Sequence, residues 1–130
     1  MCKVLNISYK ITGFLSHEEA LKHLAMLDIM VLPSKRISTT ELNIPIKIIE
    51  AWALGIPIVA TKHRVFIEMS FKDGEHLVYC EPNPRDVAKA ILRLINDEEL
   101  RRKLSKIGPK LARKFNYDKI ADALISVLKI

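Results

Sequence analysis

The fold of this 130-residue chain is decided by residues 43–61, which read NIPIKIIEAWALGIPIVAT. Asn43 is a suitable N-cap, and Pro45 suits the first turn of a helix, where a missing N–H costs little. Gly55 then ends the helix. The apolar run that follows, residues 58–60, is typical of a strand covered on both faces. A helix that leads directly into a buried strand predicts a parallel α/β sheet.

Two charged side chains on this helix, Lys47 and Glu50, indicate a function as well as a structure. A lysine in the first turn faces the positive end of the helix dipole, which disfavours it by about 0.3–1 kcal/mol. An anion held by the free N–H groups at the helix start would offset that cost. The alternative is a surface ion pair between these two residues, which would stabilise the helix by roughly 0.2–0.5 kcal/mol.

The pattern Pro-x-Lys-x-x-Glu-Ala-x-Ala-x-Gly-x-Pro-Ile-Val-Ala over residues 45–60 resembles the donor-site signature of retaining glycosyltransferases of the two-domain B type, glycosyltransferase group 1. Four further segments fit the family in the same order, so the resemblance covers nearly the whole chain. They are Thr12-Gly13-Phe14, residues 28–34 with their Pro-Ser end, residues 73–78 and Phe115-Asn116-Tyr117. The resemblance implies the nucleotide-sugar-binding, C-terminal domain of a hexosyl-transferring enzyme, truncated at its N-terminus.

In that family, the glutamate that Glu50 matches hydrogen-bonds the ribose of the donor, and amides at the helix start approach its diphosphate or sugar. Residues Gly13 and Phe14 match positions near the nucleobase. The resemblance assigns no general base. It implies a substrate-binding set of Gly13, Phe14, Thr40, Asn43, Ile44, Pro45, Ile46, Lys47 and Glu50.

The polar stretch 33–42 is the expected place for additional donor contacts. Loops after the carboxyl ends of strands line the ligand crevice in open α/β sheets. A merely flexible connection is the other interpretation. The family places a sugar-binding acid eight residues before Glu50, where this chain has Leu42. The nearest acid is Glu41, and Asn43 is the residue that can take over part of the role.

The composition fits one domain with a sizeable core, since 49% of the residues are hydrophobic. No apolar run reaches the roughly 18 residues that cross a bilayer, and the start lacks a secretory pattern. The two cysteines and four histidines show no metal-ligand spacing. We therefore expect a reducing, cytoplasmic location, no metal site, and no cofactor other than the nucleotide-sugar substrate.

The net charge is +6, and much of it falls on a predicted helix that begins after Asp97. Leucine and isoleucine recur there at helical spacing, which places the basic residues on the opposite face. A solvated helix face and peripheral contact with an anionic membrane surface are the two interpretations. Aromatic residues are scarce around this face, so no nucleic-acid partner is expected. The basic residues are Arg101, Arg102, Lys103, Lys106, Lys110, Arg113 and Lys114.

The remaining elements follow from caps and periodicity. Strands are predicted at 7–13, 28–32, 57–61 and 76–79. Helices are predicted after the Ser16–Glu19 capping box, after Asn83, after Asp97 with an interruption at Gly108-Pro109, and at 118–128, with a short helix or turn at 63–69. The chain 1–130 is thus predicted to be a single partial domain, a Rossmann-like parallel sheet of about four strands flanked by helices, with a helical C-terminal third.

The resemblance also implies missing strands. The family's domain has six strands in the order 3-2-1-4-5-6, and this chain matches only 3, 4, 5 and 6. Three interpretations remain open: the chain is a fragment, its first strand pairs directly with residues 28–32, or a partner chain fills the gap. The expected partners are a nucleotide sugar, the missing N-terminal acceptor domain or a partner chain, and a second copy of this chain.

The leading hypothesis is the donor-binding part of a glycosyltransferase, with little or no turnover by the isolated chain. The alternative is a non-catalytic nucleotide-binding or assembly module that keeps the fold. A receiver-like signalling domain is a third hypothesis. It needs acids at the carboxyl ends of strands, whereas Asp28 precedes its strand.

Overall fold

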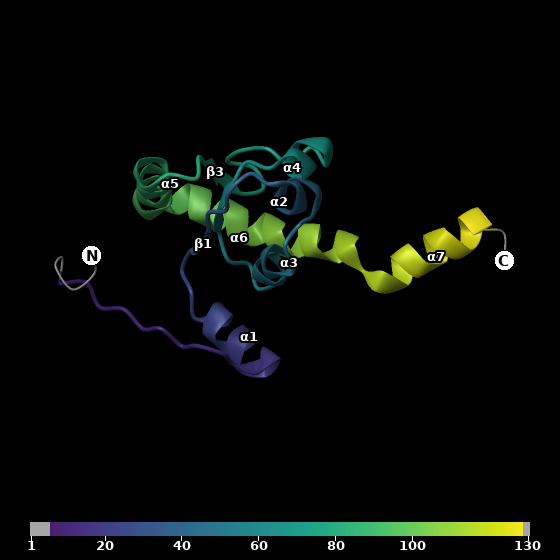
Figure 1. Ribbon diagram of the computed structural model, residues 1–130, viewed down its shortest axis with the longest axis horizontal. Coiled ribbons are helices and arrows are strands. Elements are labelled where there is room, and N and C mark those ends of the chain that lie inside the picture. Colours follow the sequence, from purple (N-terminus) through teal and green to yellow (C-terminus); the bar gives the residue numbers. More distant parts are fainter. Residues whose placement is uncertain (1–5, 129–130) are drawn as a thin grey trace.

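A computed structural model describes residues 6–128 (Figure 1). Its centre is a parallel sheet in the order β1-β2-β3, formed by β1 (Met30–Leu32), β2 (Ile58–Thr61) and β3 (Val78–Cys80). Every residue of the central strand β2 is buried, because helices cover both faces of a parallel sheet. The predicted α/β class with its parallel sheet and flanking helices is confirmed.

Helices make up most of the described residues, and three of the side-chain caps predicted for them are present. Ser16 and Glu19 form the capping box, Asn83 accepts from the Asp86 N–H, and Asp97 accepts from the Leu100 N–H. None of the helices in the described part is long and apolar enough to cross a bilayer. The helices are α1 (His17–Ala25), α2 (Ser38–Leu42), α3 (Ile46–Ala53), α4 (Arg64–Glu68), α5 (Pro84–Asn96), α6 (Glu98–Ala112), the 3-10 turn η1 (Arg113–Phe115) and α7 (Tyr117–Leu128).

Two apolar clusters hold the sheet between its helices. One contains Trp52 of α3 together with Ile58 and Ala60 of β2. The other contains Val59 of β2 and Leu94 of α5. Alternate residues of β2 therefore face opposite layers, as the two-residue period of a strand requires. Helix α6 contributes to both clusters, and α7 extends away from the body (Figure 1).

The predicted interruption at Gly108-Pro109 is wrong, because α6 runs unbroken from Glu98 to Ala112. Proline inside a helix costs about 3 kcal/mol. Packing offsets this cost, since α6 lies against α3 and buries Leu104, Gly108 and Leu111. Local propensity favoured a break, and tertiary contacts override it.

The strand predicted at 7–13 is also absent, so the sheet in the described residues has three strands instead of about four. This segment is irregular and largely exposed, and it runs outside the body toward α1 (Figure 1). A strand satisfies its backbone only by pairing. Among the described residues β1 pairs with β2 alone, so the direct pairing of the first segment with residues 28–32 does not occur.

Candidate functional site at the carboxyl ends of the strands

Polar side chains from three loops meet where the strands end. The Ser34 N–H donates to Thr61 Oγ1 at 3.0 Å, which joins the ends of β1 and β2. Arg36 donates to the Lys62 carbonyl at 3.2 Å and forms a bidentate pair with Glu81 at 2.8 and 2.9 Å. This pair lowers the pKa of the Glu81 carboxyl. The three strand ends are therefore fastened together at the edge where α/β sheets hold their ligands.

A buried histidine lies below this edge. His63 is 2% exposed, and its Nε2 lies 2.6 Å from Ser34 Oγ. Its Nδ1 lies 3.0 Å from Glu41 Oε1, and Glu41 Oε2 accepts from the Arg64 N–H at 2.9 Å. These hydrogen bonds, from His63 first and then from the Arg64 amide, lower the pKa of the Glu41 carboxyl. Both oxygens of Glu41 are thus engaged within the chain.

The stretch 33–42 is not a simple loop, because residues 38–42 form the short helix α2. The hydroxyl of Thr40 accepts from the Ile37 N–H at 3.0 Å and donates to the Lys35 carbonyl at 2.6 Å. The Asn43 side chain donates to the Thr39 carbonyl at 3.2 Å. Thr40 and Asn43 therefore bind neighbouring backbone, and Asn43 does not cap α3 as expected.

Helix α3 begins one turn beyond α2, with Pro45 in the N-cap position and no side-chain cap from the described residues. The first N–H groups of a helix have no acceptor within it, so those of Ile46 and Lys47 are available to a ligand. Lys47 is exposed, and the ion pair with Glu50, the alternative interpretation of these two residues, is not formed in the described part. Ile44 packs against the core beside this start.

Glu50 lies one turn further along α3, with 17% of its side chain exposed. Its Oε1 is 3.7 Å from Nε2 of His17 in α1. The carboxylate therefore sits on the flank of α3 that faces α1, while Ile48 and Trp52 on the same helix enter the core. Glu50 follows Lys47 by three residues, so the two side chains lie on the same face of α3.

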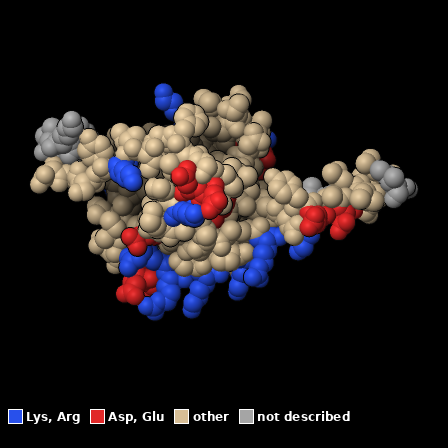
Figure 2. Space-filling view, turned by 90° about the horizontal axis from the view of Figure 1, so that it is seen from below, with Lys and Arg blue, Asp and Glu red and all other residues tan. Residues whose placement is uncertain are grey.

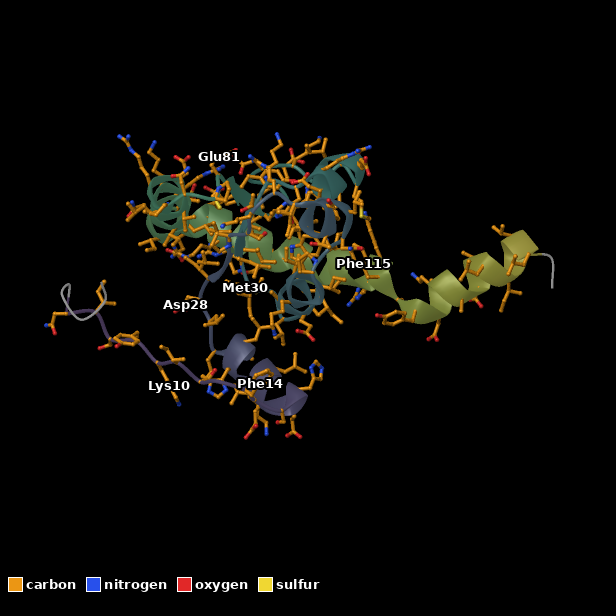
Figure 3. The ribbon with its side chains drawn as sticks, viewed as in Figure 1. Lys10, Phe14, Asp28, Met30, Glu81 and Phe115 are labelled. Carbon is orange, nitrogen blue, oxygen red and sulfur yellow. The ribbon has the colours of Figure 1, made fainter. Side chains whose placement is uncertain are left out.

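Gly13 and Phe14 immediately precede α1, and Phe14 is fully exposed (Figure 3). Gly13 has a φ of +65° with open space around it, a conformation that glycine adopts without strain. Helix α1 reaches Glu50 through His17, which follows Phe14 by three residues. Of the predicted set, Lys47 and Glu50 lie one turn apart on α3, Thr40 and Asn43 bind neighbouring backbone, and Gly13 and Phe14 lie in the segment before α1.

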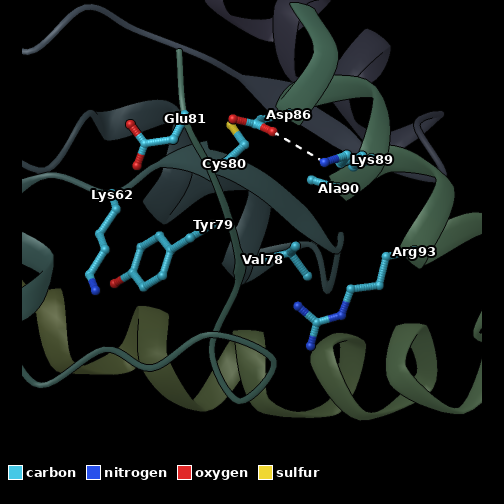
Figure 4. A pocket seen from close by; sticks show the side chains of 9 residues that line it. All are labelled: Lys62, Val78, Tyr79, Cys80, Glu81, Asp86, Lys89, Ala90 and Arg93. Atoms are coloured by element: carbon cyan, nitrogen blue, oxygen red, sulfur yellow. Dashed lines mark ion pairs between the residues drawn. The ribbon is translucent and has the colours of Figure 1, made fainter. Parts of the chain in front are cut away.

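A separate hollow of about 350 Å³ lies beside the edge strand β3 (Figure 4). Lys89 lies 3.8 Å from Asp86, and Lys62 stands over the Tyr79 ring at 5.7 Å. Burial first, and then the charge of Asp73, raises the pKa of Tyr79 to about 12. None of the predicted substrate-binding residues lines this hollow, and its cations already have partners.

Ser34 and Arg36 belong to the stretch 33–42, where donor contacts are expected from the sequence, whereas His63 and Glu81 were not predicted as members of this edge. Each follows the carboxyl end of a strand by two or fewer residues, apart from Arg36, which follows by four. That position is itself a signal, because such residues converge in a parallel sheet. The motif drew attention to the helix and away from them.

The sheet, the crossover helices and the polar edge define an open, Rossmann-like α/β fold. Sucrose-phosphate synthase from Thermosynechococcus elongatus has the same fold, with a TM-score of 0.78 over 98% of this chain and 32% of that one, at 22% identity. The model of the family "Glycosyl transferases group 1" matches residues 3–111. The chain therefore belongs to this glycosyltransferase family.

Two relatives support the assignment. An uncharacterized glycosyltransferase of Methanocaldococcus jannaschii is 28% identical over 115 residues, 88% of this chain. The amylovoran biosynthesis glycosyltransferase AmsK of Erwinia amylovora is 30% identical over 90 residues, 68% of this chain. The matches span only 31% and 22% of the lengths of these two proteins, respectively.

Proposed function

We propose that this chain is the donor-binding part of a glycosyltransferase and that it binds a nucleoside-diphosphate sugar at the start of α3. In the complete protein, the sugar passes to an acceptor held elsewhere. The chain's own contribution is to position the donor and to stabilise the negative charge that builds up on the departing diphosphate. We expect little or no turnover by these 130 residues, and measured sugar transfer by them would contradict this.

One observation carries the proposal. The uncapped start of α3, the exposed Lys47 and the partly exposed Glu50 lie within one turn of each other. Helix-start amides and an ammonium suit a diphosphate, and a carboxylate accepts hydrogen bonds from ribose hydroxyls. Lys47 faces the positive end of the dipole without an acid partner in the described part, so a bound anion would relieve its unfavourable position.

Calorimetric titration with UDP, GDP and ADP tests this proposal. We expect one of the three to bind and Glu50→Ala to weaken that binding at least tenfold, since a hydrogen bond to a charged group contributes about 1.5–3 kcal/mol. Glu68→Ala is the matched control, because Glu68 is an exposed acid on α4 that pairs only with Arg64 in the described part. Equal losses in the two variants, or no binding by the unaltered chain, would refute the donor site.

The alternative is a non-catalytic nucleotide-binding or assembly module, and the open edge of β1 favours it. In the described residues β1 pairs on one side only, and Val31 is 36% exposed there. An unpaired strand edge is a template for another chain. The occupant that we propose is the acceptor-binding part of the enzyme or a partner chain, and a second copy takes that place when the chain is alone.

Sedimentation velocity over a hundredfold range of concentration tests this edge. We expect a dimer that dissociates on dilution, and Val31→Lys should shift it toward the monomer, because charge on an edge strand opposes pairing. Lys22→Ala, on the exposed face of α1, serves as a control. A monomer mass at every concentration would refute self-association.

The basic face of α6 supports peripheral contact with an anionic membrane. Figure 2 shows lysine and arginine side chains in a row along one edge of the molecule. On the opposite face Leu104 and Leu111 are buried, as the sequence predicts. Among the described residues, only one member of the exposed row has an acid partner, Arg102 with Glu98. The exposed row comprises Arg102, Lys103, Lys106, Lys110, Arg113 and Lys114.

Flotation with vesicles tests this contact. We expect the chain to float with vesicles rich in phosphatidylserine and not with neutral ones. Each basic residue near such a surface contributes about 1 kcal/mol. Reversing Lys103, Lys106 and Lys110 to Glu should therefore weaken binding at least about 100-fold. The control is the same charge change at three exposed lysines elsewhere, Lys22, Lys35 and Lys89. Equal losses of vesicle binding in the two triple variants would show that the chain is attracted by its net charge alone and not by the basic face of α6.

A further inference from the structure

We propose that His63 is a positioning residue of the donor site: through Glu41 it fixes helix α2, and with α2 the segment 43–47 that would receive the diphosphate. This inference rests on the proposed function. Glu41 then has a structural role instead of binding sugar, although it is the acid nearest to the expected sugar-binding position. The histidine itself touches no ligand.

The hydrogen bonds determine how the three side chains are arranged. An ionised carboxylate only accepts, so the His63 Nδ1 carries the proton donated to Glu41. The Nε2 lies 2.6 Å from the Ser34 hydroxyl, which can act as donor or acceptor toward it. The buried ring of His63 therefore joins the carboxyl end of β1 to α2. Its two partners are distant from it in sequence, Ser34 by 29 positions and Glu41 by 22.

Glu41 extends this connection to the start of α4. Its second oxygen accepts from the backbone N–H of Arg64 at 2.9 Å. Helix α2 has only five residues, too few to persist without outside contacts. In the described part its contacts are chiefly with α4, to which Glu41 provides both side-chain hydrogen bonds. The position of α2 therefore depends on this carboxylate.

The start of α3 depends in turn on α2. Leu42 ends α2 and Ile46 begins α3, so three residues separate the two helices. The Asn43 side chain ties the first of these three residues to α2 by donating to the Thr39 carbonyl. A shift of α2 would therefore move the backbone amides of residues 46 and 47 away from the positions in which they would bind the diphosphate. A site that must form as the ligand arrives binds more weakly than one formed beforehand.

Two substitutions at one buried position separate this role from general stability. In His63→Asn the amide nitrogen takes the place of Nδ1, so it keeps the donor to Glu41 and loses the contact with Ser34. In His63→Gln the amide extends to the place of Nε2, so it keeps the Ser34 contact and loses Glu41. Both remove the same buried ring, and the shorter His63→Asn leaves the larger gap, so loss of packing alone would make His63→Asn the more disruptive variant.

The measurements are UDP, GDP and ADP binding by calorimetry and amide hydrogen exchange of residues 38–47. We expect His63→Gln to weaken binding and to speed exchange at least about tenfold, the smaller end of the effect of a charge-assisted hydrogen bond. His63→Asn should stay within about threefold of the unaltered chain in both. Glu41→Gln should behave like His63→Gln, because its amide can accept from only one of the two donors.

Glu68→Gln on α4 is the control and should change neither measurement, since Glu68 contacts Arg64 and no residue of α2 through a hydrogen bond in the described part. Equal losses in His63→Asn and His63→Gln would overturn the inference, as would faster exchange without weaker binding. Either result leaves the donor site standing. If the unaltered chain binds none of the three nucleotides, the proposed function fails and the inference falls with it.

Discussion

The substitution Gly108→Ala, which adds a single methyl group, tests the close packing of α6 against α3. Gly108 is buried where α6 lies against α3. A Cβ at this position would lie 2.8 Å from the Trp52 carbonyl oxygen and 3.2 Å from the Trp52 Cα. Both are backbone atoms of a residue that is 1% exposed. The Trp52 Nε1–H donates to the His76 carbonyl at 3.1 Å, so this backbone cannot retreat without breaking another contact.

The sign of the effect of Gly108→Ala distinguishes two explanations. Helix propensity alone would make the alanine variant more stable by about 0.8–1.0 kcal/mol. Overpacking costs typically 1–3 kcal/mol, and a distance this short against backbone belongs at the upper end. We therefore expect a net loss of about 2 kcal/mol in the free energy of unfolding. With a urea m-value of roughly 2 kcal/mol/M, the midpoint should fall by about 1 M.

Urea unfolding followed by circular dichroism measures this change. Lys106→Ala, at an exposed position of the same helix, is the matched control and should shift the midpoint little. If Gly108→Ala proves as stable as the unaltered chain or more so, α6 does not approach α3 as closely as described. Packing against α3 would then not be what keeps the helix continuous through Pro109.

Two further predictions concern ionisable groups. Cys80 is 6% exposed, and burial raises the pKa of its thiol. Its alkylation by iodoacetamide at pH 8 should therefore be at least about tenfold slower than that of glutathione, and unfolding in urea should remove the difference. Fast modification of Cys80 in the folded chain, located by peptide mass spectrometry, would contradict this. Arg36 lowers the pKa of Glu81 in the fold, so the stability that this pair adds is present above the unfolded pKa of about 4.5 and disappears as the pH falls below it. Unfolding midpoints of the unaltered chain and Glu81→Gln should therefore converge in acid, and a constant difference from pH 7 to pH 3 would show that the pair contributes nothing.

The sequence alone predicted much of the local structure correctly. The capping box at Ser16 and the caps at Asn83 and Asp97 involve atoms three residues apart, so the pattern of side chains suffices to place them. The three strands were predicted within about two residues of their bounds. The turn at Gly55 has the positive φ that a glycine stop predicts.

The wrong predictions each depend on a contact between distant segments. The sequence around Pro109 favours a helix break, and only the packing of α6 on α3 prevents it. Residues 7–13 have the composition of a strand but no neighbouring strand among the described residues. Helix α2 is too short to be seen as a pattern, and it exists because Glu41 bonds to His63 and to the start of α4.

The features of the candidate site also fall into two groups, those that local sequence predicts and those that depend on contacts between distant segments. Local sequence is enough to predict the helix and strand of residues 43–61, the family resemblance they carry, and the position of Lys47 and Glu50 on one helix, because all of these depend on neighbours within a turn or two. That Glu50 faces α1, and that a buried histidine holds Glu41, becomes visible only in the folded chain. Those arrangements form when strand ends that are far apart in sequence are brought side by side, and no local pattern encodes which polar atoms then meet.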